Sequence, residues 1–463
     1  MAIEHPGEPK SNEMRRLIGE REPIALRTFT PTQVAIAKSA GVFHWTADGR
    51  KLYDYTSGVL VTNLGHNPAE WQRKFLGYMG WSQPPAGKGY FEAAPLTAYN
   101  AIAGVEAEAV KRLVANLQSK PGGKRLEQIL WAASGSEAVQ KALWASLARD
   151  PKRDLILATR DGFHGKKGLA EAVTGSESDK NRDPRVRFIS FPKEECKDVA
   201  LRGAPFDPAP CRAELEKIKA EGRGIACLIT EPYLGGGGSF HPPKAFLQTL
   251  QDFCRKNDIV FILDEIQSNF GRTGKMYAFE TYGLEPDVVV LGKGLGNGVP
   301  AACAAGRADV FGALSYGEGS DTFSGNPLCC AAALATLDLF ESQDILGAAR
   351  KSSKIIEEGL VALKKLPFVK QVRGEEGGMV WGVEIADFGG KSANEVANAC
   401  ILAAYRGDAE GRAVHLMGPL AKRVLRIAPP LTITEAEARD SVAALGACFA
   451  AVLSGAATAP ASR

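Results

Sequence analysis

Between Thr97 and about Phe340, short apolar runs alternate with longer segments of helical periodicity. The expected strands are 128–133, 154–158, 186–190, 225–230, 258–264, 287–291 and 301–305. The expected helices include 97–118, 136–149, 211–221, 243–256 and 327–341. Strands that alternate with helices favour a mostly parallel sheet that is covered on both faces and joined by right-handed crossovers. We therefore predict an α/β fold.

The two ends of the chain have a different pattern. A hairpin is indicated within 41–63, and an alternating segment at 378–385 lies among helical patterns. We expect residues 1–75 and 345–463 to form a smaller α+β domain from both chain ends, and 76–344 to form a large domain. Residues 1–25 are expected to be a poorly ordered arm or a helix that packs on a partner, and the tail from Ser454 is expected to be frayed.

The composition is that of an ordinary soluble globular protein, with 45% hydrophobic and 24% charged residues. A net charge of +3 and the lack of a long Lys/Arg cluster give no indication of a nucleic-acid partner. The most apolar stretch, 328–337, is too short to span a bilayer, and the N-terminus does not resemble a secretory signal. The nine cysteines lack metal-binding spacing, and adjacent Cys329 and Cys330 are expected to be buried small residues. We expect a cytoplasmic protein without a membrane segment or a bound metal.

A lysine and an aspartate each follow an expected strand. Asp264 comes directly after the apolar run 259–263, and Lys293 follows the run 288–291 in a glycine-rich segment. Open parallel sheets bind ligands beyond the carboxyl ends of their strands, so both side chains could reach one crevice. An amine that forms a Schiff base and a carboxylate that keeps a heterocyclic nitrogen protonated together suit a covalent aldehyde cofactor. Taken singly, Asp264 could equally be a helix cap and Lys293 a solvated loop residue.

The turn before the expected helix 136–149 is a third candidate element. Ser134 and Glu137 have the spacing of a capping box, which alone would explain them. The free N–H groups at a helix start, together with the Ser136 hydroxyl, could also bind an anion such as a phosphate. Nucleotide motifs do not fit, because GxxxxGK[ST] is absent and the glycines of 292–298 lack GxGxxG spacing, which argues against a Rossmann-type dehydrogenase.

The segment Asp264–Gly274, DEIQSNFGRTG, followed by Lys293 in a Leu-Gly-Lys-Gly context, resembles the signature of class III aminotransferases. The resemblance runs from about Gly41 to Thr434, which is nearly the whole chain. Members of this family are pyridoxal-phosphate enzymes of fold type I, with a large domain on a mostly parallel sheet and a smaller α+β domain. The resemblance implies that Lys293 and Asp264 are the catalytic residues.

Further positions match the family by their motifs. The resemblance implies that Gly135 and Ser136 bind the cofactor phosphate, that Phe163 stacks on the pyridine ring, and that Gln267 contacts the phenolic oxygen. Thr322 matches a threonine that reaches the phosphate of the neighbouring subunit. This implies a homodimer with shared active sites, or a tetramer of such dimers. The expected cofactor-binding residues are Gly135, Ser136, Phe163, His164, Glu231, Asp264, Gln267, Lys293 and Thr322.

Departures from the family pattern bear on the substrate. Branches that use glutamate and 2-oxoglutarate usually carry a glutamate at the position of Gly236, where it neutralises an active-site arginine. The matching arginine is Arg426, and without this glutamate it must swing out or meet solvent when a neutral substrate binds, because a buried unpaired charge is costly. The pattern favours an amine or ω-amino acid donor with pyruvate as the acceptor, and Tyr233 and Val59 as further substrate-binding residues. Ser324 stands where glycine is common, a change that the fold is expected to tolerate.

The expected reaction is transamination through a Lys293 aldimine and a pyridoxamine form of the cofactor. One alternative is an aminotransferase of the glutamate/2-oxoglutarate type, which acts on 4-aminobutyrate or acetylornithine. Others are a racemase, a decarboxylase or an aminomutase of the same fold, because the cofactor performs the chemistry that these enzymes share. A catalytically inactive binding protein is the alternative of a different class. Such a protein would be expected to lose Lys293 or Asp264, and this chain has both.

Overall fold

The computed structural model describes residues 3–81, 89–99, 101–180 and 182–453, so the tail that was expected to be frayed lies outside the described residues. The chain divides into two compact units, which we call the small unit (1–68 and 345–463) and the large unit (69–344). The first division follows Pro68, slightly before the expected boundary at residue 75. No helix of the described part of the chain is long and apolar enough to cross a membrane.

The large unit is built on a seven-stranded sheet with the order β4-β10-β9-β8-β7-β5-β6. Its strands are β4 (Gln128–Ala132), β5 (Arg153–Thr159), β6 (Val186–Ile189), β7 (Gly224–Thr230), β8 (Val260–Asp264), β9 (Val288–Leu291) and β10 (Ala302–Gly306). Strands β5 to β9 pair in parallel, whereas β10 pairs antiparallel with β9 and β4. All seven expected strands form, which confirms the prediction of a mostly parallel α/β sheet.

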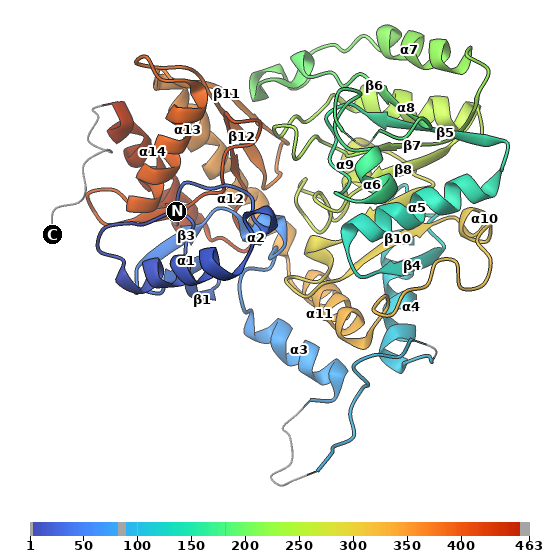
Figure 1. The fold of residues 1–463 in the computed structure, drawn as a ribbon, viewed down its shortest axis with the longest axis horizontal. Coiled ribbons are helices and arrows are strands. Elements are labelled where there is room, and N and C mark those ends of the chain that lie inside the picture. Colours follow the sequence, from blue (N-terminus) through green and yellow to red (C-terminus); the bar gives the residue numbers. More distant parts are fainter. Residues whose placement is uncertain (1–2, 82–88, 100, 181, 454–463) are drawn as a thin grey trace. The chain divides into compact units, whose positions relative to one another are not determined.

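Helices of the large unit pack against this sheet and against one another (Figure 1). They are α3 (Ala69–Met79), α4 (Gly104–Gln118), α5 (Gly135–Arg149), α6 (Gly168–Ala172), α7 (Ala209–Lys219), α8 (Lys244–Lys256), α9 (Ala278–Tyr282), α10 (Ala308–Phe311) and α11 (Pro327–Ser342), with 3₁₀ turns η2 (Glu194–Cys196), η3 (Val199–Leu201) and η4 (Lys293–Leu295). Helix α5 packs on β4, β9 and β10, and α8 on β7 and β8. Central strands such as β9 are buried on both faces, which explains their unbroken apolar sequences. Cys329 and Cys330 are buried and free in α11, as expected.

The small unit contains two sheets, with the orders β1-β2-β3-β13 and β11-β12-β14. Its strands are β1 (Ile36–Ala40), β2 (Phe43–Thr46), β3 (Lys51–Asp54), β11 (Val369–Gly374), β12 (Trp381–Ile385), β13 (Ala413–His415) and β14 (Val424–Ile427). Its helices are α1 (Pro9–Arg21), α2 (Ser57–Leu60), α12 (Ile345–Ala362), α13 (Ala393–Arg406) and α14 (Glu435–Leu453), with 3₁₀ turns η1 (Ile24–Leu26) and η5 (Leu363–Lys365). Strands β2 and β3 pair antiparallel, which confirms the expected hairpin.

The N-terminal segment is not a poorly ordered arm. It forms α1, and a buried ion cluster fixes it within the small unit. Glu8 accepts hydrogen bonds from Arg15 (2.8 Å), Arg50 (2.6 Å) and the Tyr405 hydroxyl (2.7 Å). A buried carboxylate is tolerated when it is paired and hydrogen-bonded in this way. The charged composition that suggested disorder therefore supplies a buried polar network.

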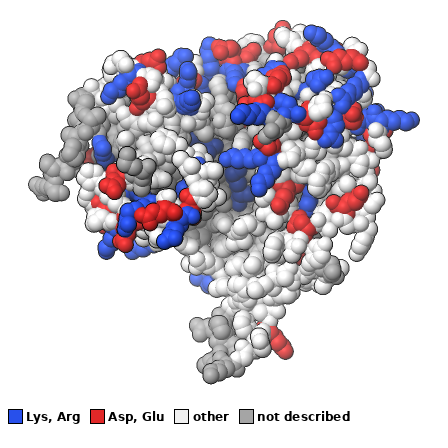
Figure 2. Space-filling view, in the orientation of Figure 1, with Lys and Arg blue, Asp and Glu red and all other residues white. Residues whose placement is uncertain are grey.

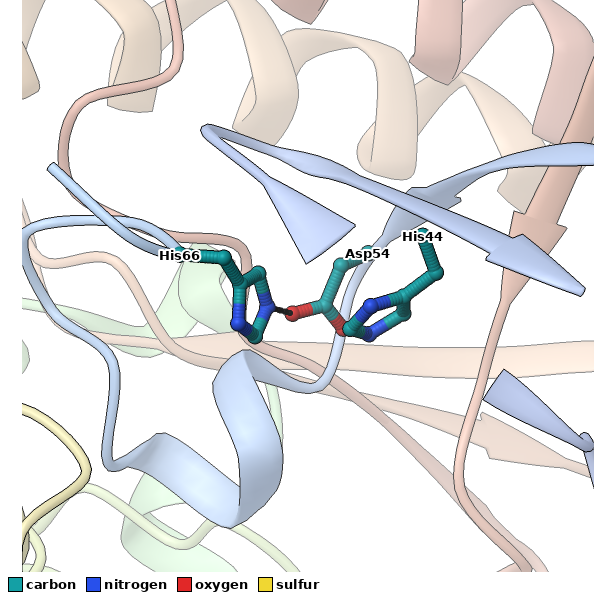
Figure 3. Close-up of side chains that lie close together, drawn as sticks. All are labelled: His44, Asp54 and His66. Atoms are coloured by element: carbon teal, nitrogen blue, oxygen red, sulfur yellow. Dashed lines mark hydrogen bonds and ion pairs between the residues drawn. The ribbon is translucent and has the colours of Figure 1, made fainter. Parts of the chain in front are cut away.

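A histidine–aspartate cluster lies in the small unit, where His44 and His66 flank Asp54 (Figure 3). The Asp54 carboxylate accepts hydrogen bonds from the Thr56 backbone N–H (2.7 Å) and from His66 Nε2 (2.7 Å), and His44 Nε2 lies 3.4 Å away. This is the only group of three His, Cys, Asp or Glu among the described residues whose atoms could share one cation. Each carboxylate oxygen of Asp54 accepts at least one of these hydrogen bonds.

His415 on β13, beside this cluster, should make the small unit sensitive to acid. Burial lowers the pKa of His415 to about 4, although nearby Asp54 opposes this and His44 and His66 reinforce it. An unfolded histidine titrates near 6.5, so the unfolded chain binds more protons between these two values. The free energy of unfolding should therefore fall by on the order of 3 kcal/mol as the pH drops from about 6.5 to about 4.

Urea denaturation at several pH values between 7 and 4 would measure this loss. A His415→Gln variant should show a flatter profile than the wild type over that window, and a chelator should leave both profiles unchanged. Equal acid sensitivity of the two proteins would exclude His415 as the cause, and a chelator effect would indicate a bound cation.

Candidate active site

A cavity of about 210 Å³ lies in the large unit, beyond the carboxyl ends of the parallel strands. Its walls are formed by Ser134, Gly135, Ser136, Phe163, His164, Gly165, Glu231, Asp264, Ile266, Gln267 and Lys293. All the expected cofactor-binding residues except Thr322 therefore surround one space. They follow β4, β5, β7, β8 and β9, whose carboxyl ends share one edge of the sheet.

The backbone around Lys293 is unusually constrained. Lys293 begins the turn η4 with a φ of 46°, in the left-handed region that non-glycine residues rarely adopt. A Cβ on Gly296 would lie 2.1 Å from the Val299 carbonyl oxygen, so only glycine fits there. The Asn269 side chain donates to the Gly292 carbonyl (3.1 Å). These contacts fix the turn from which the lysine side chain enters the cavity.

Asp264 makes a hydrogen bond with His164 that the sequence did not reveal. The distance from His164 Nδ1 to Asp264 Oδ2 is 2.7 Å, and both side chains are almost fully buried. The other carboxylate oxygen accepts from the Ile266 backbone N–H (3.0 Å). Because both of its oxygens accept hydrogen bonds, the Asp264 carboxylate has a fixed orientation toward the cavity.

Glu231 holds two parts of the cavity wall together. Its carboxylate accepts from the backbone N–H groups of Phe163 (2.8 Å) and Gly235 (3.2 Å). Burial raises the pKa of Glu231 to about 7, although His164 opposes the shift. A Cβ on Gly235 would lie only 2.0 Å from Gln267 Oε1, so this glycine allows the Gln267 side chain to reach its place.

The turn at the start of α5 caps the helix, which is one of the two roles that the sequence allowed. Ser134 caps the helix by accepting from the Glu137 N–H (3.3 Å), while the Glu137 carboxylate accepts from the Ala133 N–H (3.0 Å). Gly135 and Ser136 line the cavity in the first turn of this 15-residue helix. The free N–H groups and the positive end of the helix dipole thus adjoin the space that an anion would occupy.

The model of the class-III aminotransferase family matches residues 88–449 of the sequence. The chain belongs to the class-III aminotransferases. It is 29% identical to the 4-aminobutyrate aminotransferase of Mycobacterium leprae, over 94% of each chain. It is 30% identical to the acetylornithine aminotransferase of Corynebacterium efficiens, over 92% of this chain and 95% of that one.

Solved structures share the fold of this class-III aminotransferase. An amine transaminase from an uncultivated Pseudomonas species, solved in its pyridoxal-phosphate-bound form, has a TM-score of 0.75 and 26% identity, and covers 93% of this chain and 96% of that chain. An ornithine aminotransferase from Toxoplasma gondii has a TM-score of 0.78 at 23% identity, covers 96% of each chain, and shows the fold alone. The expected family, fold and enzyme class are confirmed.

Four expected site residues of this class-III aminotransferase lie outside the walls of the cavity. Thr322 is in an exposed turn that precedes α11. Tyr233 is buried, and its ring stacks on His241 with centroids 4.3 Å apart. Val59 in α2 is exposed, and Arg426 on β14 is buried; both belong to the small unit. The roles of these four residues, like those of the residues that line the cavity, stay predictions.

Proposed function

We propose that this class-III aminotransferase uses pyridoxal phosphate to transfer an amino group from an amine or ω-amino acid to a 2-oxo acid, with pyruvate favoured as the acceptor. The observation that carries the proposal is that Lys293 and Asp264 line one cavity together with the first turn of α5. The family supports the reaction type, and the choice of donor and acceptor rests on the residues discussed below.

The residues of the cavity fit pyridoxal phosphate. The first turn of α5 offers N–H groups and the Ser136 hydroxyl to a phosphate. Asp264 offers a buried, oriented carboxylate to a protonated ring nitrogen. Gln267 Oε1 is buried and has no hydrogen-bond partner among the described residues, which suits the side-chain amide to a polar group of a ligand. Phe163 is 43% exposed in the cavity wall, where a ring could stack on it.

When bound, pyridoxal phosphate supplies an electron sink for negative charge at the substrate carbon. Lys293 would then have two tasks: its amine would hold the cofactor, and once free it would move the proton taken from the substrate carbon. Asp264 keeps the ring nitrogen protonated through a charge-assisted hydrogen bond. His164 holds the Asp264 carboxylate in orientation. Glu231 positions Phe163 by accepting a hydrogen bond from the Phe163 backbone N–H.

The preference for pyruvate is supported by Gly236. A Cβ at this position would lie 3.1 Å from the Phe163 Cβ, so residue 236 packs directly against an aromatic side chain of the cavity wall. A glutamate here would place a carboxylate beside that wall, whereas this chain has a glycine at the position. The second candidate acceptor is 2-oxoglutarate, which the similarity to proteins named 4-aminobutyrate and acetylornithine aminotransferases favours.

A homodimer with shared sites is also part of the proposal. Large apolar side chains are exposed on the large unit. Single exposed apolar residues are ordinary, whereas larger groups of them mark interfaces. They include Tyr90, Phe91, Leu96, Tyr99, Ile102, Tyr316 and Phe323. In the view of Figure 2, few charged residues surround α3 and α4. Thr322 and Phe323 are neighbours in an exposed turn, as contact with a second subunit requires.

The free cysteines suit a cytoplasmic location.

The test is a panel of donors and acceptors combined with an Arg426→Ala variant. With amine alone, the enzyme should release about one carbonyl product per subunit, which a racemase or a decarboxylase would not do. Pyruvate should then be consumed faster than 2-oxoglutarate. Arg426→Ala should lower kcat/KM for the oxo acid by roughly tenfold to a hundredfold, because a charge-assisted contact with its carboxylate is lost.

The same variant should leave the reaction with a simple amine within about threefold of the wild type. Arg423→Ala, which removes an exposed arginine three positions away, is the matched control and should change neither half-reaction. Equal losses in both half-reactions would rule out the role of Arg426. A clear preference for 2-oxoglutarate would establish the second candidate instead.

A further inference from the structure

Lys141 is a buried lysine on α5 whose ammonium group is completely partnered. Its side chain is 4% exposed. The Nζ atom donates to the Trp131 carbonyl (2.6 Å), to Asp321 Oδ2 (2.7 Å) and to Ser324 Oγ (3.0 Å). An ammonium has three N–H donors, and each has a partner here. Because a buried charge is costly unless it is paired, these contacts form a specific site for the lysine.

Asp321 and Ser324 close the turn that Lys141 contacts. Asp321 Oδ1 accepts from the backbone N–H groups of Phe323 (3.1 Å) and Ser324 (2.8 Å). The Ser324 hydroxyl donates to the second oxygen of Asp321, which also accepts from Lys141. Although burial opposes it, hydrogen bonds from Lys141 and Ser324 hold the pKa of Asp321 below its usual range. We call Lys141, Asp321 and Ser324 the Lys141 cluster.

The next residues fix the other side of the same turn. Asn326 caps α11 by accepting from the Cys329 N–H (3.0 Å), and its amide donates to the Phe323 carbonyl (2.6 Å). A Cβ on Gly325, which has a φ of 67°, would lie 2.9 Å from the Trp131 ring. The backbone from Asp321 to Asn326 is therefore held at both ends.

The residues between these contacts point outward. Thr322 is exposed, and Phe323 is 64% exposed. Fixing the backbone of one residue costs about 1–2 kcal/mol of conformational entropy. A buried apolar side chain would offset this cost, but an exposed side chain does not. A rigid turn with exposed side chains is instead suited to binding something outside the unit, because a group that is already in place loses less entropy on binding.

We infer that the Lys141 cluster is a set of positioning residues that holds Thr322 in place for the phosphate of the partner subunit's cofactor. The inference rests on the proposed function, in which Thr322 reaches across a dimer. Lys141 is on α5, and the first turn of that helix carries Gly135 and Ser136 of the chain's own cavity. The cluster thus links the phosphate turn of one site to the residue that serves the other. Ser324 stands where glycine is common in the family, and its hydroxyl contacts both Lys141 and Asp321 in this cluster.

The test is a double-mutant cycle on the affinity of the apo dimer for pyridoxal phosphate, measured by absorbance titration. Thr322→Val should weaken binding by roughly tenfold or more, because a hydrogen bond to a charged phosphate is lost. Lys141→Met should weaken binding by roughly threefold to tenfold. The double variant should bind no more weakly than Thr322→Val alone, within about twofold, since Lys141 acts through Thr322.

Ser324→Ala removes one hydroxyl of the Lys141 cluster with less risk to folding. It should also weaken binding, and it is combined with Thr322→Val in a second double-mutant cycle. Ser146→Ala, whose hydroxyl bonds within α5 to the Ala142 carbonyl (2.8 Å), is the control and should leave the affinity unchanged. Losses that multiply in the double variants, or unchanged affinity in Lys141→Met and Ser324→Ala, would overturn the inference while the proposed function stands. Unchanged affinity in Thr322→Val would remove the role of Thr322 and the inference with it. A wild type that binds no pyridoxal phosphate would instead refute the proposed function.

Discussion

Replacing Lys293 by alanine should abolish turnover, with a loss of at least on the order of ten-thousand-fold. The variant lacks both the amine that attaches the cofactor and the amine that carries the proton. Lys293 is the only lysine among the described residues that line the cavity, so no other lining amine can take its place. The readouts are turnover, the visible absorbance of the purified protein, and mass spectrometry after borohydride reduction. Reduction should link the cofactor to the Lys293 peptide of the wild type.

Two further measurements make this result specific. Lys275→Ala removes an exposed lysine that directly follows the signature segment, and it should retain both the colour and the activity. Added small amines should restore part of the turnover of Lys293→Ala, because they can carry the proton that the lysine side chain carried. Covalent attachment to another lysine, or normal turnover of Lys293→Ala, would show that the catalytic amine has been misassigned.

The sheet of the large unit could be predicted from the sequence because its strands are buried on both faces. Runs such as Val288–Leu291 are apolar without interruption. Helical segments with polar residues at their ends lie between these runs. The carboxyl ends of parallel strands meet at one edge, so Asp264 and Lys293 could also be expected to meet. Of the two expectations for residues 1–25, the poorly ordered arm was wrong and the helix is present as α1, although its charged residues did not predict burial. Glu8 and Arg15 in fact form a buried ion pair within the small unit.

The partners of the site residues could not be predicted in the same way. His164 contacts Asp264, and Lys141 contacts Asp321, across sequence separations at which no motif spacing is informative. Family resemblance indicated that His164 belongs to the site but not what it touches. It also led us to expect Ser324 to be merely tolerated, whereas its hydroxyl contacts both Asp321 and a buried lysine on another element. Such contacts depend on the three-dimensional arrangement of the strands.

Asp264→Asn should lower kcat by roughly a thousandfold or more, which corresponds to about 4 kcal/mol of transition-state stabilisation. The amide has nearly the shape of the carboxylate, and its oxygen can still accept from the Ile266 N–H, so the cavity should keep its form. The change removes the negative charge that keeps the ring nitrogen of the cofactor protonated. The rate of the amine half-reaction measures this loss directly, and Asp258→Asn on the exposed surface is the control.

His164 distinguishes an effect of charge from an effect of packing. His164→Gln keeps a donor beside Asp264 and should lose much less activity, roughly tenfold. Because His164 acts through Asp264, the double variant should be no slower than Asp264→Asn alone, within about twofold. Losses that multiply would mean that His164 contacts the reacting groups independently. Near-normal activity of Asp264→Asn would mean that the negative charge of this aspartate is not required, and that the protonated ring nitrogen is not the source of the stabilisation.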